Sequence, residues 1–179
     1  METEAAALEQ LEARISALEN PPKKMTLVVM SGDMDKLFGA FIIATGAAAM
    51  GIDVVMFFTF WGLRALKKAE AKHGKSFFGR MIGMGMFEGG GIEKANPSHY
   101  SFGGMGRWMF GKMMRANNVA SLPELRELAV NLGVRMYGCQ MSMDVMEIPQ
   151  ECFIDGCQEP VGVGFMLMEA QESQIQFFI

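Results

Sequence analysis

Cysteine is scarce in this chain of 179 residues: there are three, Cys139, Cys152 and Cys157, and their spacing matches no disulfide framework. The N-terminus is acidic and lacks the apolar core of a secretory signal, which predicts a reducing cytoplasm and free thiols. Histidine is rarer still, with two residues. Because a structural zinc site needs four ligands and the spacing supports none, we expect no metal and no cofactor.

The chain also lacks the motifs of several common enzyme classes. It has no G-x-S-x-G turn of a serine hydrolase, and "SGDMDK" does not have the spacing of a phosphate-binding P-loop. The glycines of "GMGMFEGGG" and "GGMG" lack the strand-then-helix context of a dinucleotide fingerprint. The net charge is −4, so the chain has no excess of basic residues. Nucleic-acid binding is therefore not predicted.

A single long hydrophobic run is absent as well. Residues 37–52 carry no charge and residues 54–63 are strongly apolar, but Asp53 separates the two stretches and the first is rich in small residues. A strand–helix–strand alternation explains both stretches better than a membrane span, and membrane association is therefore the less favoured alternative.

Strands and helices alternate along most of the chain, which favours an α/β fold with a mainly parallel sheet of about five strands and helices on both faces. A capping box formed by Ser121 and Glu124 marks the start of one helix, and Gly133 marks its end. Strands are expected at 25–30, 52–60, 134–138 and 174–179, and helices at 34–50, 61–74, 121–132, 142–148 and 167–173. Residues 161–165 are expected to form either a short strand or a turn.

The predicted single domain spans residues 21–179. Two segments differ from its strand–helix pattern: one precedes the domain, and the other is inserted into it. In residues 1–20, Leu8, Leu11, Ile15 and Leu18 form a short a/d pattern, so this helix either packs on its own domain or serves as a coiled-coil handle for oligomerisation. Residues 75–118 are predicted to form a Met-, Gly- and aromatic-rich insertion with short helices and no clean period. Three roles stay open for this insertion: a lid over a site, a surface that binds a partner, and a contact between protomers.

In an open parallel sheet, ligands gather at the carboxyl ends of the strands. Residues that follow the predicted strands should therefore meet at one edge. They are Ser31, Gly32, Asp33, Thr59, Trp61, Gly62, Gly138 and Cys139.

Cys139 stands between a predicted strand and a helix-like run. The N–H groups and dipole of a helix N-terminus stabilise an anion, so we expect a lowered pKa and a nucleophilic thiolate at this position. The alternative is a buried, inert thiol. Cys157 is a possible resolving partner for Cys139 if the loop between them folds back.

Several strings in the right order resemble one known family. They are "VVMSGDMDK", "MFFTFWGL", "GGMG", "YGCQMSMDVM" and the ending "GVGFMLMEAQESQIQFFI". From Met25 to Ile179 the chain resembles the DsrE/DsrF-like family, in its peroxiredoxin-like or sulfur-reductase-like branch. The most specific string is Cys-x-Met-Ser-Met-Asp-x-Met, which places the family cysteine at Cys139. Glu147 departs from the usual continuation of this string.

The resemblance implies a three-layer α/β/α domain that forms oligomers, often trimers or hexamers. It also implies a persulfide on Cys139 that is passed to a small TusA-like carrier protein. We therefore expect a sulfur-trafficking protein, either a sulfurtransferase or a sulfur carrier. Two other functions stay open: a non-catalytic oligomeric binding or assembly module, and a thiol peroxidase or disulfide reductase that uses Cys139 with Cys157.

Overall fold

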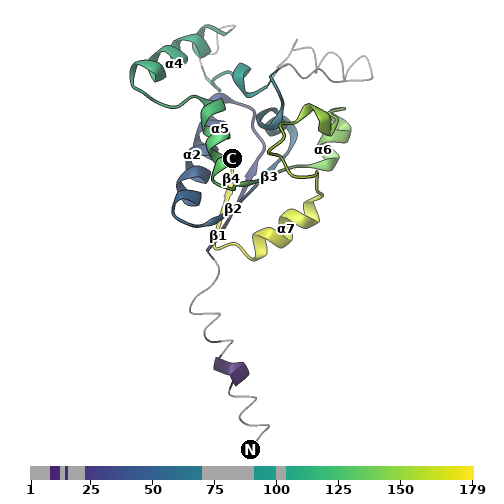
Figure 1. Ribbon diagram of the computed structural model, residues 1–179. Helices are drawn as coiled ribbons and strands as arrows, with labels where there is room; N and C mark the ends of the chain where they lie inside the picture. Colours follow the sequence, from purple (N-terminus) through teal and green to yellow (C-terminus); the bar gives the residue numbers. More distant parts are fainter. Residues whose placement is uncertain (1–8, 13–14, 16–22, 70–90, 100–103) are drawn as a thin grey trace, which may run out of the picture.

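The computed structural model describes residues 9–12, 15, 23–69, 91–99 and 104–179, and those from 23 onward form one α/β domain (Figure 1). Its centre is a parallel sheet with the strand order β3-β2-β1-β4. The elements, with η for 3-10 helices, are β1 (Lys24–Val29), α2 (Met34–Ala49), β2 (Asp53–Phe58), η1 (Phe60–Leu66), η2 (Ile92–Lys94), α4 (Met105–Ala116), α5 (Leu122–Asn131), β3 (Arg135–Gly138), α6 (Gln140–Val145), η4 (Gln150–Cys152), α7 (Val163–Gln171) and β4 (Ile175–Phe178).

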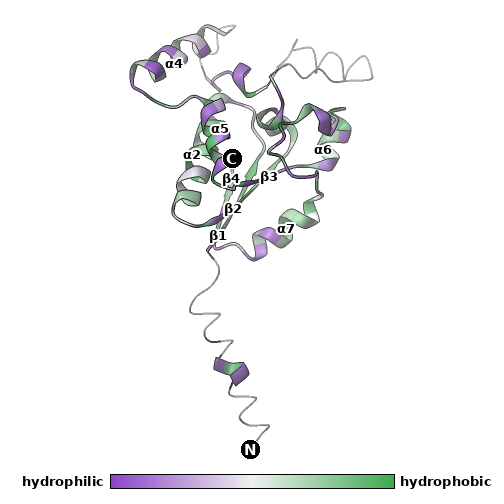
Figure 2. Ribbon diagram, viewed as in Figure 1, coloured by the Kyte–Doolittle hydropathy of each residue, from purple (hydrophilic) through white to green (hydrophobic). Residues whose placement is uncertain are grey.

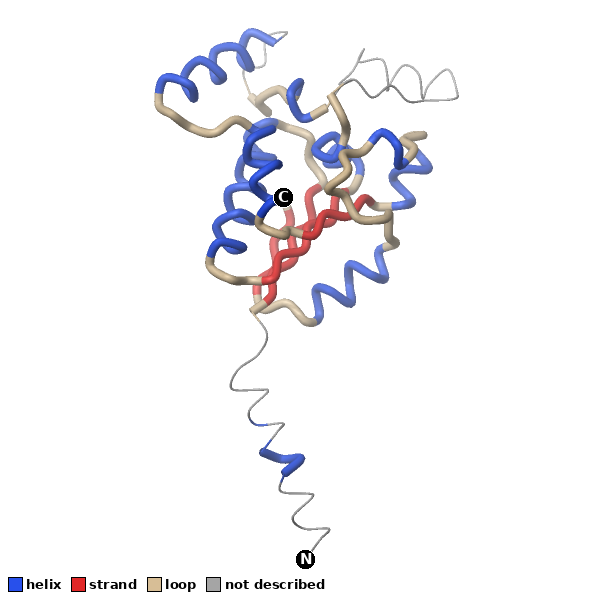
Figure 3. The backbone as a smooth tube through the Cα atoms, in the orientation of Figure 1, coloured by secondary structure: helices blue, strands red, loops and turns tan. Residues whose placement is uncertain are grey.

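The two central strands are buried because their sequences are continuous apolar runs. β1 reads "KMTLVV" and β2 reads "DVVMFF", and residues 54–58 of β2 are all buried. Such runs suit parallel strands that are covered on both faces. The strands lie in the middle of the domain with helices on either side (Figure 3), and the green colour of the sheet in Figure 2 marks it as the hydrophobic centre.

Helices cover both faces of the sheet, as the three-layer prediction requires. The chain runs from β1 through α2 to β2, and then through α5 to β3, so right-handed crossovers place α2 and α5 on the same face. The return from β3 to β4 passes through α6 and α7 on the other face (Figure 1). The predicted fold class is confirmed.

The strand count differs from the prediction of about five, because the described sheet has four strands. Residues 157–161 run parallel to β3 but touch it only at isolated bridges, Met136 with Cys157 and Cys139 with Val161. The short strand or turn expected at 161–165 is wrong from Val163 onward, because α7 begins there.

Turn and cap signals located the ends of α2 and α5 correctly. Ser121 donates from its backbone N and its Oγ to the Glu124 carboxylate, at 2.7 and 2.8 Å, and these bonds form the predicted capping box of α5. Gly51 and Gly133 end their helices with φ of 77° and 78°, a region that favours glycine.

The helix predicted over 61–74 is wrong in its described part. Residues 60–66 form the 3-10 helix η1, and Lys67 is buried rather than solvated. Residues 70–74 lie outside the described residues, as do 75–90 and 100–103 of the insertion. In the N-terminal segment only 9–12 and 15 are described; 9–12 are helical, and Leu11 and Ile15 are exposed. No described helix is long and apolar enough to cross a bilayer.

Candidate functional site

Cys139 lies at the carboxyl edge of the sheet, directly after β3. Its backbone N donates to the Phe58 carbonyl at 2.8 Å, which ties it to the end of the neighbouring strand β2. Cys139 is also the N-cap residue of α6, and its own carbonyl accepts from the Met143 N at 3.0 Å. Only 5% of the residue is exposed. The predicted strand–helix junction is therefore present, and its sulfur-bearing residue is buried.

A pair of buried hydroxyl groups lies beside this junction. Thr59 Oγ1 and Ser142 Oγ are 2.7 Å apart and share a hydrogen bond. Thr59 follows β2, whereas Ser142 stands three residues after Cys139 and hence on the same side of α6. Both residues are buried. This bond joins the helix that carries Cys139 to the end of β2.

Close backbone packing makes the edge rigid. A Cβ atom at Gly62 would lie 2.2 Å from the Val29 carbonyl oxygen, and one at Gly138 would lie 2.9 Å from the Phe153 ring. Only glycine allows these approaches. The Gly62 N donates to the carbonyls of Met30 and Thr59, so the 3-10 helix η1 is fastened onto the ends of β1 and β2.

The segment before α7 covers Cys139 from the outer side of β3. The Gln140 N donates to the Val161 carbonyl, and the Val161 N donates to the Gly138 carbonyl, both at 3.0 Å. The first backbone N–H of α6 is thus already bonded. The sequence predicts that N–H groups at the start of this helix stabilise the Cys139 sulfur. Because the Gln140 N–H is bonded to Val161, this prediction applies only to the N–H groups that follow Gln140.

The predicted site residues fall into two neighbouring groups. Thr59, Gly138 and Cys139 come together at the ends of β2 and β3. The second group follows β1, two strands away from Cys139, and consists of Ser31, Gly32 and Asp33 with Trp61 and Gly62 packed against it. Within it, Ser31 Oγ donates to the Asp33 carboxylate at 3.0 Å and accepts from the Asp33 N at 3.1 Å.

Three residues of the site were not singled out from the sequence: Ser142, Phe153 and Val161. Ser142 lies inside the "CQMSMDVM" string, where a hydroxyl three residues after the cysteine on a short apolar helix is a usable signal. Phe153 packs against Gly138, and Val161 bridges to Cys139. No local pattern marks the last two, because their roles depend on a loop that returns to β3.

The other two thiols have different surroundings. Burial raises the pKa of the Cys157 thiol to about 12, although the nearby Arg126 guanidinium lowers it. Burial likewise raises the pKa of Cys152, opposed by the Lys67 ammonium. Neither group is set up as a nucleophile at neutral pH.

The register of the covering segment separates Cys157 from Cys139. Cys157 pairs with Met136, three residues before Cys139, which corresponds to about 10 Å along a strand. A disulfide requires Cα atoms within roughly 7 Å of each other. A bond between these two cysteines therefore needs the backbone to move.

Comparison with known proteins agrees with this geometry. The family model described as "DsrE/DsrF/DrsH-like family" matches residues 21–178. The uncharacterized protein YrkE of Bacillus subtilis is 39% identical over 158 residues, which cover 88% of this chain and 97% of that protein. The sulfur carrier protein DsrE2 of Allochromatium vinosum is 35% identical over 161 residues, which cover 88% of this chain and 98% of that protein.

A solved structure gives the same result for the fold. The crystal structure of the ychN protein from E. coli superposes with a TM-score of 0.53 at 12% identity, and the match covers 88% of this chain and 99% of that one. At this identity the likeness concerns the fold alone. Together with the match of the family model to almost the whole α/β domain, these findings place the chain in the DsrE/DsrF/DrsH-like family.

Proposed function

We propose that this chain carries sulfane sulfur as a persulfide on Cys139 and passes it to a partner thiol. The observation that carries the proposal is the position of Cys139: it is the one cysteine at the carboxyl edge of the sheet, between β3 and α6. Membership of the DsrE/DsrF/DrsH-like family and the similarity to a protein named as a sulfur carrier support sulfur trafficking in general terms.

The chemistry would be two thiolate exchanges. In the first, the Cys139 thiolate attacks the outer sulfur of a donor persulfide R–S–SH; the new S–S bond forms as the S–S bond of the donor breaks, and R–S⁻ leaves with the bonding pair. In the second, an acceptor thiolate attacks the outer sulfur of Cys139–S–SH, and the Cys139 thiolate leaves with the bonding pair. The sulfane sulfur keeps its oxidation state in both steps, so no external oxidant is needed.

Burial of Cys139 suits a carrier that must hold a labile group. Water and stray thiols reach a 5%-exposed residue slowly, and Val161 with its two backbone bonds closes the outer side. Loading and release then require this cover to open. In the proposal the donor and acceptor are thiol proteins, with a TusA-like carrier as the acceptor, and the reaction takes place in a reducing cytoplasm.

We also propose that the chain works as a homo-oligomer, a trimer or a hexamer. β4 is an edge strand whose residues are all exposed. It carries Ile175, Phe177 and Phe178, and the adjoining α7 exposes Leu167 and Met168. An apolar sheet edge of this kind is normally covered by another chain. Light scattering should give a mass that is a multiple of three protomers, and Phe178→Lys should lower it.

A non-catalytic binding module is the second candidate, and the same burial of Cys139 favours it. A transfer experiment separates the two. The protein is treated with polysulfide, freed of donor, and then given a small thiol acceptor. Under our proposal the acceptor gains sulfane sulfur from wild type and from Cys152→Ser and Cys157→Ser, but not from Cys139→Ser. Equal transfer by Cys139→Ser, or none by wild type, contradicts the proposal.

A further inference from the structure

The insertion has a charge opposite to that of the rest of the chain. Residues 75–118 contain six Lys and Arg and two Glu, a net charge of +4, whereas the whole chain carries −4 and the other residues therefore −8. The same insertion holds seven of the nineteen methionines and one of the two tryptophans. Basic charge and apolar side chains are thus concentrated in one segment.

α4 is the described helix of this insertion, and it carries both properties. It contains Arg107, Lys112 and Arg115 and no acidic residue. Met105, Met109 and Met113 follow one another at spacings of four, so they form one stripe along the helix. Trp108 and Phe110 flank this stripe, and all five of these apolar side chains are exposed, Trp108 to 60%.

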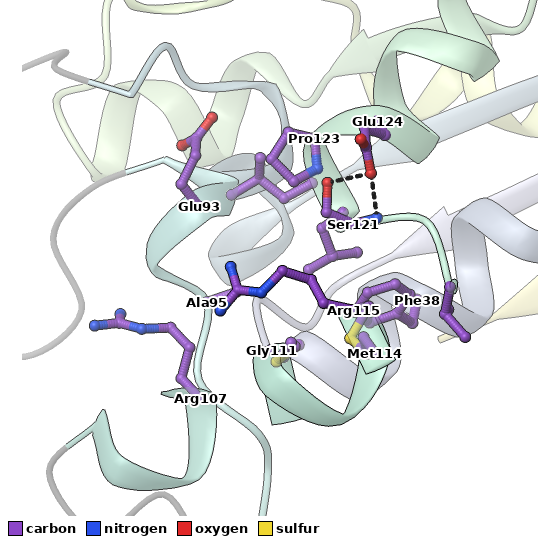
Figure 4. A pocket seen from close by; sticks show the side chains of 14 residues that line it. Phe38, Glu93, Ala95, Arg107, Gly111, Met114, Arg115, Ser121, Pro123 and Glu124 are labelled. Atoms are coloured by element: carbon purple, nitrogen blue, oxygen red, sulfur yellow. Dashed lines mark hydrogen bonds between the residues drawn. The ribbon is translucent and has the colours of Figure 1, made fainter. Parts of the chain in front are cut away.

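The stripe faces away from the domain. On the inner side of α4, Gly106 is buried, Arg107 Nη1 donates to the Lys94 carbonyl at 3.0 Å, and Met114 lines a cavity of about 410 Å³ together with Phe38 (Figure 4). In Figure 1 the helix projects from the body, well away from α6. The outward stripe is therefore covered neither by the described core nor by the Cys139 site.

Its chemistry fits the surface of a lipid bilayer. Interfacial helices combine an apolar face with Lys and Arg and with aromatic rings that sit at the headgroup level. Lys112 Nζ lies 4.6 Å from the centre of the Trp108 ring, an arrangement in which a cation and an indole stay together at one depth. Twelve residues span about 18 Å, too short to cross a bilayer and long enough to lie in its plane.

We propose that α4 docks this protein on an anionic lipid bilayer, with the Met105–Met109–Met113 stripe, Trp108 and Phe110 in the interface and the exposed Lys112 and Arg115 against lipid headgroups. Charge complementarity selects this occupant: the helix is wholly basic, whereas the apolar surface of α7 and β4 carries Glu169 and Glu172 beside it. The proposal does not depend on Cys139, so vesicle binding and sulfur transfer can fail separately.

Vesicle co-sedimentation of the full chain tests the proposal. Wild type should bind vesicles of phosphatidylcholine with phosphatidylglycerol and bind pure phosphatidylcholine much more weakly, and added salt should weaken the binding. Lys112→Glu/Arg115→Glu should lower the partition coefficient at least about tenfold, because each cation near an anionic surface contributes measurably. Lys36→Glu/Lys68→Glu, which reverses two exposed cations elsewhere, should change it little.

The apolar stripe is tested in the same assay. Met109→Ser/Met113→Ser should bind as weakly as the charge variant, whereas Ile42→Ser/Met50→Ser, at two exposed apolar residues in and just after α2, should bind like wild type. Thermal unfolding confirms that each variant is folded. The proposal is overturned if wild type ignores anionic vesicles, if both serine pairs behave alike, or if Met109→Ser/Met113→Ser alters the lipid-free mass in light scattering, which would assign the stripe to a second copy or another protein.

Discussion

The edge that carries Cys139 and the helix α4 are built on opposite principles. At the edge, a Cβ at Gly62 would meet the Val29 carbonyl and one at Gly138 would meet the Phe153 ring, and the buried hydroxyls of Thr59 and Ser142 share a hydrogen bond. α4 instead leaves its apolar stripe in solvent and touches the body along one side. The first region keeps the Cys139 residue out of water, whereas the second exposes apolar side chains to solvent.

A pair of glycine substitutions should show the largest difference between the regions. Gly62→Ala places a Cβ against the Val29 carbonyl, so the backbone must move, and we expect a loss of at least about 3 kcal/mol in the free energy of unfolding. Gly111→Ala lies within α4, where a Cβ meets nothing within 4 Å, and should raise stability by up to roughly 1 kcal/mol through helix propensity. Urea denaturation measures both, and equal effects would contradict the contrast.

The hydroxyl pair should give the next largest effect. Thr59→Val leaves the buried Ser142 hydroxyl without this partner, which should cost about 1–3 kcal/mol of unfolding free energy. Thr59→Val/Ser142→Ala removes both groups and should cost less than the sum of the two single variants. Chemical denaturation of wild type, Thr59→Val, Ser142→Ala and the double variant completes a double-mutant cycle. Strict additivity would mean that the bond does not couple β2 to α6.

Shortening Val161, which covers Cys139, should have a smaller effect than the changes above. Val161 is half-buried, and Val161→Ala removes two methyl-sized groups, which lowers the cost of opening by roughly 0.8 kcal/mol and speeds alkylation of Cys139 about fourfold. Val163→Ala shortens an exposed side chain two residues later and serves as the control. Alkylation rates followed by mass spectrometry decide the matter; an unchanged rate in Val161→Ala would show that access runs by another route.

The smallest effect concerns the contact that anchors the insertion to α2. Burial raises the pKa of Asp35, but the Ser98 N and Oγ, each donating at 2.8 Å, outweigh burial and hold the pKa below its ordinary 3.8. Because the folded pKa is lowered, the contact contributes fully above about pH 4 and is lost as pH falls through the folded value. The Ser98 amide shift in an NMR titration should follow this pKa, and Asp35→Asn should abolish the titration.

A Ser98 amide that titrates at the ordinary aspartate value, or that still titrates in Asp35→Asn, would contradict this prediction. The anchoring contact would then contribute nothing that depends on pH.

Local signals explain why most of the sheet and its helices could be predicted. The apolar runs of β1 and β2 and the capping box at Ser121 and Glu124 depend on neighbours in the sequence. The 3-10 helix η1 and the burial of Lys67 could not be found in this way, because both depend on distant segments: η1 packs through Gly62 on the end of β1, and Lys67 pairs with Phe153. Short helices were predicted in the insertion, but the bounds of α4 were not, because its glycines obscure the period and its apolar stripe faces outward.

The site was predictable to a similar depth. Cys139, Gly138 and Thr59 follow from the rule that strand ends share one edge, but the partner of Thr59 lies 83 residues away, and only the folded chain reveals it. The cover by Val161 depends on a loop that leaves β3 and returns to it.

The location of a bound sulfur atom tests the central claim most directly. After brief exposure to polysulfide and removal of the excess, the folded protein is trapped with an alkylating reagent, digested and sequenced by tandem mass spectrometry. The account predicts one additional sulfur atom, on the peptide that contains Cys139, in wild type and in Cys152→Ser/Cys157→Ser. Additional sulfur only on Cys152 or Cys157, or on no cysteine, would contradict it.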